Sequence, residues 1–143
     1  MTAALRFYLA GPMTGYPLQN FPAFADATAW LRTQGHVVLS PAEMDLDLGF
    51  DPAIPLEDQG FDWTETMERD LEALMTAQAV AFLPGSRRST GALAEYEVAR
   101  ALGLRVFALA APAPFTLTEA SYELMDQWLL GACPSHLADW AAA

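Results

Sequence analysis

The stretch that decides the fold is AVAFLPGSRRSTGALAEYEVARALGLRVFALA, residues Ala79–Ala110. It opens with an apolar run, Ala79–Leu83, that has the length of a buried strand, and the glycine-containing loop Pro84–Ser89 follows. The next segment, Thr90–Leu102, repeats its apolar residues at helical spacing, and a second apolar strand occupies Arg105–Ala110. Strands separated by a helix of this length predict a parallel sheet.

The rest of the chain continues this alternation. We expect two further strands and three further helices at Leu5–Ala10, His36–Leu39, Phe21–Thr33, Trp63–Met75 and Thr118–Leu130. The acidic connection Ser40–Asp62 holds three prolines and two glycines, too many for regular structure over its whole length. Asp62 and Glu65 have the spacing of a capping box at the start of the following helix.

These elements predict one α/β domain over residues 1–143. We expect a doubly wound, flavodoxin-like or Rossmann-like parallel sheet of four to five strands with helices on both faces. Ligands of such sheets bind at the carboxyl ends of the strands. The site should therefore lie in the loops after the first and third strands.

The composition argues against several classes of function. Eighteen acidic residues against seven basic ones give a net charge of −11, which repels a nucleic acid polymer over most of the surface. No apolar run has membrane-spanning length, and the single cysteine, Cys133, forms no internal disulfide, so we expect a cytoplasmic protein without a membrane partner. His36 and His136 lack partners at zinc-ligand spacing, and no GxGxxG or Walker motif occurs, so we expect no metal and no cofactor.

Two carboxylates occupy apolar helical stripes. Glu95 shares one face with Ala92 and Ala99, and Asp70 lies four residues before Leu74. Removal from water raises the pKa of a carboxyl group, which is how catalytic acids and nucleophiles are tuned. Such a pair suits glycosyl chemistry, in which one carboxylate attacks the sugar carbon and another group assists proton transfer. The alternative is that both are structural groups satisfied by neighbouring hydrogen bonds.

The start of the Thr90–Leu102 helix is the most plausible anion site. Backbone amides at a helix start bind phosphate, and a nearby arginine adds charge. The candidates are Arg87, Arg88, Ser89, Gly91 and Ala92. The alternatives are that Ser89 is a plain N-cap and that the two arginines form a solvated loop. Glu97, three residues before Arg100, fits an ordinary exposed ion pair.

Three segments resemble the nucleoside 2-deoxyribosyltransferase-like superfamily. They are FYLAGPMTGYPLQNFPAFADATAWLRTQGHVVLSPAE, WTETMERDLEALMTAQAVAFLPG and SRRSTGALAEYEVARALGLRVF. The likeness is closest to the small bacterial and phage branch with the YLAGPMTG opening, and the superfamily also contains 2′-deoxynucleoside 5′-phosphate N-hydrolases. The resemblance implies cleavage or transfer of the N-glycosidic bond of a nucleoside or nucleoside 5′-monophosphate, without a cofactor, in a homo-oligomer. The final helix, with Tyr122, Leu124, Trp128 and Leu129, is our candidate interface.

The resemblance also assigns roles to residues. Glu95, four residues after Gly91, falls on the nucleophilic glutamate of the family, and Asp70 falls on an upstream catalytic aspartate. Ser89 stands six residues before the nucleophile, where the transferases carry an aspartate. Serine there resembles the 5′-monophosphate hydrolases, in which it contacts phosphate, so an N-hydrolase is favoured over a transferase.

The loop after the first strand corresponds to the substrate loop of the family. Its candidates are Gly11, Pro12, Met13, Thr14 and Tyr16, with glycine allowing close approach of the backbone to a ligand. The phosphate-binding hydrolases tend to carry a serine and an arginine in this loop, which are absent from it here. Tyr8 and Trp63 are aromatic candidates for stacking on a base, although aromatics at such positions also fit a core.

A second hypothesis belongs to another class of function. A small doubly wound domain can keep the pocket and serve as a non-catalytic nucleotide-binding or sensing module, because a fold does not determine a function. Two buried acids favour catalysis, since binding a neutral sugar does not require them.

Overall fold

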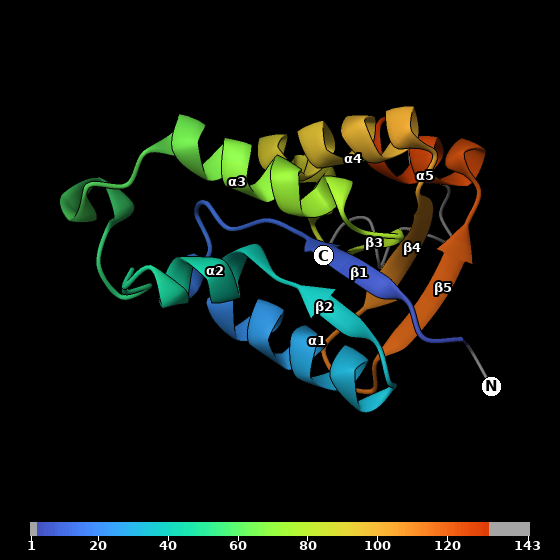
Figure 1. Cartoon of the computed structure of the whole chain (residues 1–143), viewed down its shortest axis with the longest axis horizontal. Coiled ribbons are helices and arrows are strands. Elements are labelled where there is room, and N and C mark those ends of the chain that lie inside the picture. The colour runs from blue at the N-terminus through green and yellow to red at the C-terminus, as the bar shows by residue number, and fades with distance from the viewer. Residues whose placement is uncertain (1–2, 132–143) are drawn as a thin grey trace.

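A five-stranded sheet forms the centre of the protein. The computed structural model describes residues 3–131, so Cys133 and His136 lie outside the described residues. The strands follow the order β2-β1-β3-β4-β5 (Figure 1). Their bounds are Arg6–Ala10 for β1, Val37–Leu39 for β2, Ala79–Phe82 for β3, Arg105–Ala110 for β4 and Thr116–Ala120 for β5. The first four strands are parallel, and β5 runs antiparallel to β4. This strand order is that of flavodoxin-like sheets, in which the direction of winding switches between β1 and β3.

Helices cover both faces of this sheet (Figure 1). One face carries α1 (Phe21–Thr33) and the short α2 (Pro41–Asp47). The other face carries α3 (Trp63–Met75), α4 (Thr90–Leu102) and α5 (Tyr122–Leu129). The predicted α/β architecture with helices on both faces is confirmed.

Alternate residues of each central strand belong to the two cores. Phe7 and Leu9 of β1 pack in the cluster that contains Phe24 of α1, whereas Tyr8 and Ala10 pack in the cluster beneath α3, α4 and α5. Successive side chains of a strand point to opposite faces, so a strand buried on both faces reads as a continuous apolar run. This geometry sends the Tyr8 side chain toward the helix that carries Glu95.

Most of the predicted elements have the predicted bounds. The helices α1, α3 and α4 and the strand β4 begin and end where the sequence pattern places them, and β1, β2 and β3 are each one residue shorter. Asp62 is the N-cap of α3, because its Oδ1 accepts a hydrogen bond from the Glu65 amide at 3.0 Å.

The prediction of one helix over Thr118–Leu130 is wrong. The segment Thr116–Ala120 forms the edge strand β5, paired with β4, and α5 begins only at Tyr122. Two β-branched threonines favour the strand, and Ser121 then caps α5 by accepting from the amide three residues later. The sheet is therefore not wholly parallel, since its fifth strand returns in the opposite direction.

The connection Ser40–Asp62 is more regular than its prolines and glycines suggest. Pro41 begins α2 and occupies the first helical position, where a missing amide hydrogen is tolerated. A short 3-10 helix, η2, follows at Leu56–Gln59. This connection therefore has enough structure to form a wall of the site described below.

Two expectations about the last helices are corrected. Arg100 pairs with Asp126 of α5 rather than with Glu97. Trp128 and Leu129 of α5 are each only 4% exposed, because they pack into the protein's own core and are not available to a partner. Within residues 3–131, none of the helices combines the length and the apolar character that a membrane crossing requires.

Candidate active site

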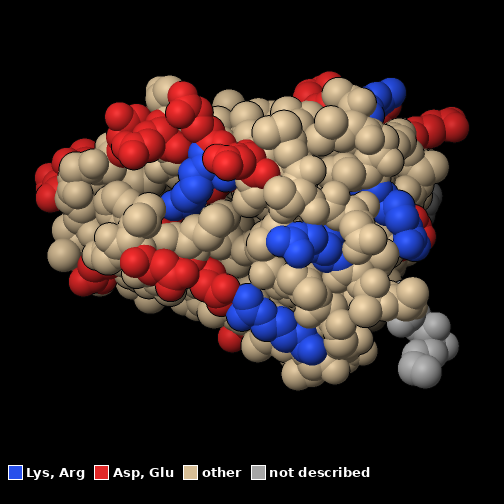
Figure 2. Space-filling model, in the orientation of Figure 1, with Lys and Arg blue, Asp and Glu red and all other residues tan. Residues whose placement is uncertain are grey.

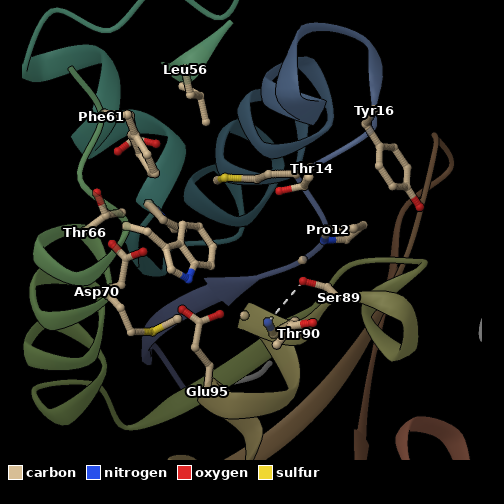
Figure 3. A pocket seen from close by; sticks show the side chains of 18 of the residues that line it. Pro12, Thr14, Tyr16, Leu56, Phe61, Thr66, Asp70, Ser89, Thr90 and Glu95 are labelled. Atoms are coloured by element: carbon tan, nitrogen blue, oxygen red, sulfur yellow. Dashed lines mark hydrogen bonds between the residues drawn. The ribbon is translucent and has the colours of Figure 1, made fainter. Parts of the chain in front are cut away.

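A pocket of about 490 Å³ opens at the carboxyl ends of β1 and β3. Three walls come from the loop after β1, from α3 and from the start of α4, and the fourth comes from α2 and the connection that follows it (Figure 3). The predicted residues that line it are Gly11, Pro12, Met13, Thr14, Tyr16, Trp63, Asp70, Arg88, Ser89, Gly91, Ala92 and Glu95. The loops after the first and third strands therefore meet at one site, as the sheet topology predicts.

Glu95 projects from α4 into the bottom of the pocket (Figure 3). Glu95 is only 5% exposed, and its Oε2 accepts a hydrogen bond from the Tyr8 hydroxyl. Burial raises the pKa of Glu95 to about 8; the Tyr8 hydrogen bond opposes this shift, and the nearby Asp70 charge adds to it. Glu95 therefore holds its proton more tightly than an exposed glutamate does.

Asp70 enters the same pocket from α3 (Figure 3). Burial raises the pKa of its carboxyl group to about 6, although Arg69 opposes the shift through a hydrogen bond and its positive charge. Two carboxyl groups with separated pKa values in one cavity are the arrangement in which an acid and a base divide their roles. The two carboxyl groups that helical periodicity marks in the sequence therefore lie at the same site.

Tyr8 does not serve as a stacking platform, which corrects one expectation. The residue is fully buried in the core beneath α4, and only its hydroxyl reaches the site, where it meets Glu95. Burial and the nearby Glu95 charge raise the pKa of Tyr8 well above its ordinary value. The hydroxyl therefore keeps its proton and donates a hydrogen bond to Glu95, which fixes the orientation of that carboxyl group.

The start of α4 is capped by Ser89. Its hydroxyl oxygen accepts a hydrogen bond from the Ala92 amide at 3.1 Å (Figure 3), so the expectation that this amide binds an anion is wrong. The Ser89 hydroxyl hydrogen can still be donated to a ligand. The amides of Thr90 and Gly91 also precede the first intrahelical bond and point out of the helix start.

The side chains of the two adjacent arginines, Arg87 and Arg88, lie in different places. Arg88 lines the pocket, whereas the Arg87 guanidinium donates a hydrogen bond to the Gly131 carbonyl oxygen at 3.2 Å, beyond the end of α5. Arg87 is therefore removed from the candidate site. A short 3-10 helix over Ser86–Arg88 turns the two side chains in different directions.

The loop after β1 is held in place by its own contacts. A Cβ atom at Gly11 would lie 2.8 Å from the Cβ atom of Leu83, so glycine is needed here for packing between β1 and the end of β3. The Asn20 side-chain amide donates to the Pro12 carbonyl oxygen at 2.8 Å, and the Tyr16 amide donates to Met13 at 3.2 Å. These contacts fix the backbone that presents Thr14 and Tyr16 to the pocket.

The sequence reasoning missed most of the fourth wall. It comprises Pro41, Asp45, Leu56 and Phe61. On the α3 wall, Thr66 and Met67 were also missed, whereas Trp63 was an expected candidate. The ring centroids of Phe61 and Trp63 lie 5.9 Å apart, and Trp63 is 55% exposed although it lines the cavity. Aromatic residues in an otherwise acidic connection are the sequence signal that could have identified this wall.

Charge is distributed unevenly around the site. Eleven of the eighteen acidic residues fall between Glu43 and Glu72, and acidic side chains gather at the end of the molecule that α2, η2 and the start of α3 form (Figure 2). Arg88 lies on the opposite wall, at the start of α4. An anionic group of a ligand is therefore favoured at the α4 wall and disfavoured at the acidic wall.

A family model described as a domain of unknown function (DUF4406) matches residues 5–108 of the chain. No curated protein matches the chain. Within the described residues, no three histidine, cysteine, aspartate or glutamate side chains are grouped so that they could hold a metal ion. The matched stretch contains Tyr8 and every residue that lines the pocket. The chain therefore belongs to the DUF4406 family.

Proposed function

We propose that the protein is an enzyme that cleaves the N-glycosidic bond of a nucleoside or nucleoside 5′-monophosphate through a glutamate nucleophile, with hydrolysis favoured over transfer to a second base. The observation that carries this proposal is the pair Glu95 and Asp70, which reach one pocket from different helices while a buried tyrosine hydroxyl orients the glutamate. The resemblance to the nucleoside 2-deoxyribosyltransferase-like superfamily assigns the same two positions to catalysis.

The first chemical step forms a glycosyl-enzyme. The ionised Glu95 attacks the anomeric carbon, the bond from this carbon to the base nitrogen breaks, and its electron pair leaves with the base. Asp70 donates a proton to the departing base and becomes a carboxylate. Tyr8 keeps its hydrogen bond to the second oxygen of Glu95 and so directs the first oxygen toward the sugar.

The second step releases the sugar. Asp70, now ionised, takes a proton from a water molecule as that water attacks the anomeric carbon, and the Glu95 carboxylate leaves. Both carboxyl groups return to their starting states, so the cycle is balanced. If a second base attacks in place of water, the same site performs transfer. The Ser89 position favours hydrolysis, because the transferases of the resembling superfamily carry an aspartate there.

The pKa values impose a condition on this mechanism. At pH 7 the pair holds one proton, and it resides mostly on Glu95, with its pKa of about 8, rather than on Asp70, with its pKa of about 6. The reactive form, with Glu95 ionised and Asp70 protonated, is therefore the less populated arrangement of that proton. The positive charge that develops on the sugar in the transition state favours this form.

The walls of the pocket orient the proposed substrate. The base lies against the aromatic wall formed by Phe61 and Trp63, near Asp70, and the sugar lies above Glu95. The position of a 5′-phosphate is then the α4 wall, where Arg88, the Ser89 hydroxyl and the first amides of the helix are donors. The acidic connection on the other side repels the phosphate and reinforces this orientation.

The test is base release from a panel of ribonucleosides, deoxyribonucleosides and their 5′-monophosphates, followed by liquid chromatography, with and without a second base. Glu95→Gln is expected to abolish release. Glu97→Gln is the matched control, because Glu97 lies on the same helix but is exposed, and it should retain the wild-type rate. Release that persists in Glu95→Gln would contradict the assigned nucleophile.

The phosphate contact is tested by Arg88→Met, with Arg87→Met as its control. We expect Arg88→Met to raise the KM of a 5′-monophosphate substrate and to leave the KM of the corresponding nucleoside unchanged. Arg87→Met should change neither, because its guanidinium binds the Gly131 carbonyl outside the pocket. Equal effects of both variants would contradict the proposed phosphate position.

A nucleotide-binding or sensing module is the second candidate. The observation that favours it is the raised pKa of Glu95, since a neutral carboxyl group donates and accepts hydrogen bonds to a sugar without attacking it. Calorimetric binding of a nucleotide by a wild-type protein that releases no base would favour this candidate over the enzyme. The homo-oligomer implied by the resemblance is part of the proposal for either candidate, with an interface that does not use Trp128 or Leu129.

A further inference from the structure

A chain of three charged side chains connects α2 to the pocket. Arg69 of α3 contacts Asp45 of α2, with 2.8 Å between Nη1 of the arginine and Oδ1 of the aspartate. The same guanidinium contacts Asp70 through Nη2 at 2.7 Å and Nε at 3.1 Å. Arg69 therefore bridges a carboxylate on the connecting segment and the carboxyl group assigned to proton transfer.

Both contacts from Arg69 to Asp70 fall on one oxygen, Oδ1. Among the described residues, no hydrogen bond engages Oδ2, and Asp70 lines the pocket. A carboxyl group carries its proton on the oxygen that does not accept from a cation, because a protonated oxygen in that place would face the guanidinium hydrogens. The geometry therefore assigns the proton of Asp70 to Oδ2.

Asp45 is buried so deeply that its carboxylate needs the contact with Arg69. The residue is 2% exposed, and an ionised carboxylate at that depth is unfavourable unless a cation faces it. It lies on α2, whose Ala42 is part of the core beneath α1, so the position of Asp45 is fixed by packing. Arg69 is further held by the Pro41 carbonyl oxygen at 3.4 Å. The guanidinium is thus anchored from α2 while it binds Asp70.

We propose that Arg69 and Asp45 are positioning residues for Asp70: Arg69 binds Oδ1 and reserves Oδ2 for proton exchange with the substrate, and Asp45 holds Arg69 and offsets its charge. The proposal rests on the proposed function of the site. When Asp70 gives its proton to the leaving base, the new carboxylate already faces Arg69. Without Asp45, the whole positive charge of Arg69 would act on Asp70 and make its protonated form, the form that can give a proton to the leaving base, rarer still.

The charged and titratable groups around Asp70 come from four elements. They are Arg69 on α3, Asp45 on α2, Glu95 on α4 and the Tyr8 hydroxyl on β1. Arg69 favours the ionised form of Asp70, whereas Asp45 favours the protonated form. Removing Arg69 and removing Asp45 should therefore shift the titration of Asp70 in opposite directions, which general loosening of the structure does not produce.

The test follows the side-chain carboxyl carbon of Asp70 by ¹³C nuclear magnetic resonance across a pH series, with the signal assigned by comparison with Asp70→Asn. We expect Arg69→Met to raise the titration midpoint by about one unit or more. We expect Asp45→Asn to lower it. Glu43→Gln is the matched control, because it also removes an acid from α2. Glu43 pairs with Arg32, and both side chains are 45% exposed. This variant should leave the midpoint unchanged.

The proposal is overturned if the midpoint stays at its wild-type value in both variants or moves in the same direction in both. If circular dichroism shows that Arg69→Met is not folded, Arg69→Lys replaces it. Lysine keeps the charge, but a single nitrogen cannot contact both carboxylates as the guanidinium does, so the midpoint should rise by a smaller amount; an unchanged midpoint counts against the proposal. The titration needs no substrate, so its failure is distinguishable from an absence of base release, which would refute the proposed function instead.

Discussion

Glu95→Gln should stabilise the protein, and the gain should grow with pH. The ordinary glutamate pKa of 4.5 applies in the unfolded chain, whereas the folded protein raises it to about 8. Below pH 4.5 both states are protonated, and Glu95 has no effect on the pH dependence of stability. Between these values the folded state binds more protons than the unfolded state, so the free energy of unfolding falls as pH rises. Glutamine does not titrate and lacks this dependence.

The size of the effect follows from the difference in pKa. Each pH unit between 4.5 and 8 lowers the wild-type free energy of unfolding by up to about 1.4 kcal/mol relative to the variant. The difference between the two proteins should therefore change by up to about 3 kcal/mol between pH 4.5 and pH 7. The carbonyl oxygen of the glutamine can still accept the hydrogen bond from Tyr8, so the contact with β1 is kept.

The assay is urea unfolding at several pH values from 5 to 8.5, monitored by circular dichroism, on wild type, Glu95→Gln and the exposed control Glu97→Gln. The curve of Glu95→Gln should diverge upward from the wild-type curve, while the control stays parallel to it. A difference that is constant with pH, or that shrinks as pH rises, would refute the argument that burial holds the glutamate neutral.

Three further predictions concern the reaction, the loop after β1 and the last helix. The pH profile of kcat/KM for base release should be a bell with apparent pKa values of about 6 and about 8, which Asp70 and Glu95 set as a coupled pair; a rate that rises steadily to pH 9 would contradict it. Gly11→Ala should lower the melting temperature, because its Cβ would lie 2.8 Å from Leu83, and calorimetry would detect this. Ser121→Ala should lower the free energy of unfolding by about 1 kcal/mol in urea titrations through loss of its N-cap bond.

Local signals account for the parts of the fold that the sequence predicted. The N-cap at Asp62 and the alternation of apolar runs with helical spacing depend on residues that are close in the chain, so they are readable without a structure. The wrong helix over Thr118–Leu130 shows the limit of this reading. Its first residues belong to a strand because they pair with the free edge of β4, and helical spacing of apolar residues carries no information about such pairing.

The residues of the site also fall into those that local sequence patterns predict and those that they do not. The apolar stripes marked Glu95 and Asp70 as buried acids, because helical periodicity is a local property. Periodicity did not reveal that Tyr8 would meet Glu95, since these residues are 87 positions apart and meet only when β1 lies under α4. It also gave no reason to separate Arg87 from Arg88, which a single turn of 3-10 helix sends in different directions.

The sequence by itself determined the α/β class, most element bounds and two carboxyl groups that an apolar surface removes from water. The tertiary structure alone decided what surrounds those groups. It brought the tyrosine hydroxyl to Glu95, Asp45 to the neighbouring Arg69 and Asp70, and Phe61 of the connection to the pocket. The physical reason is that helical and strand periodicity arise from neighbouring residues, whereas hydrogen bonds and charge pairs between distant segments depend on how the sheet orders its strands.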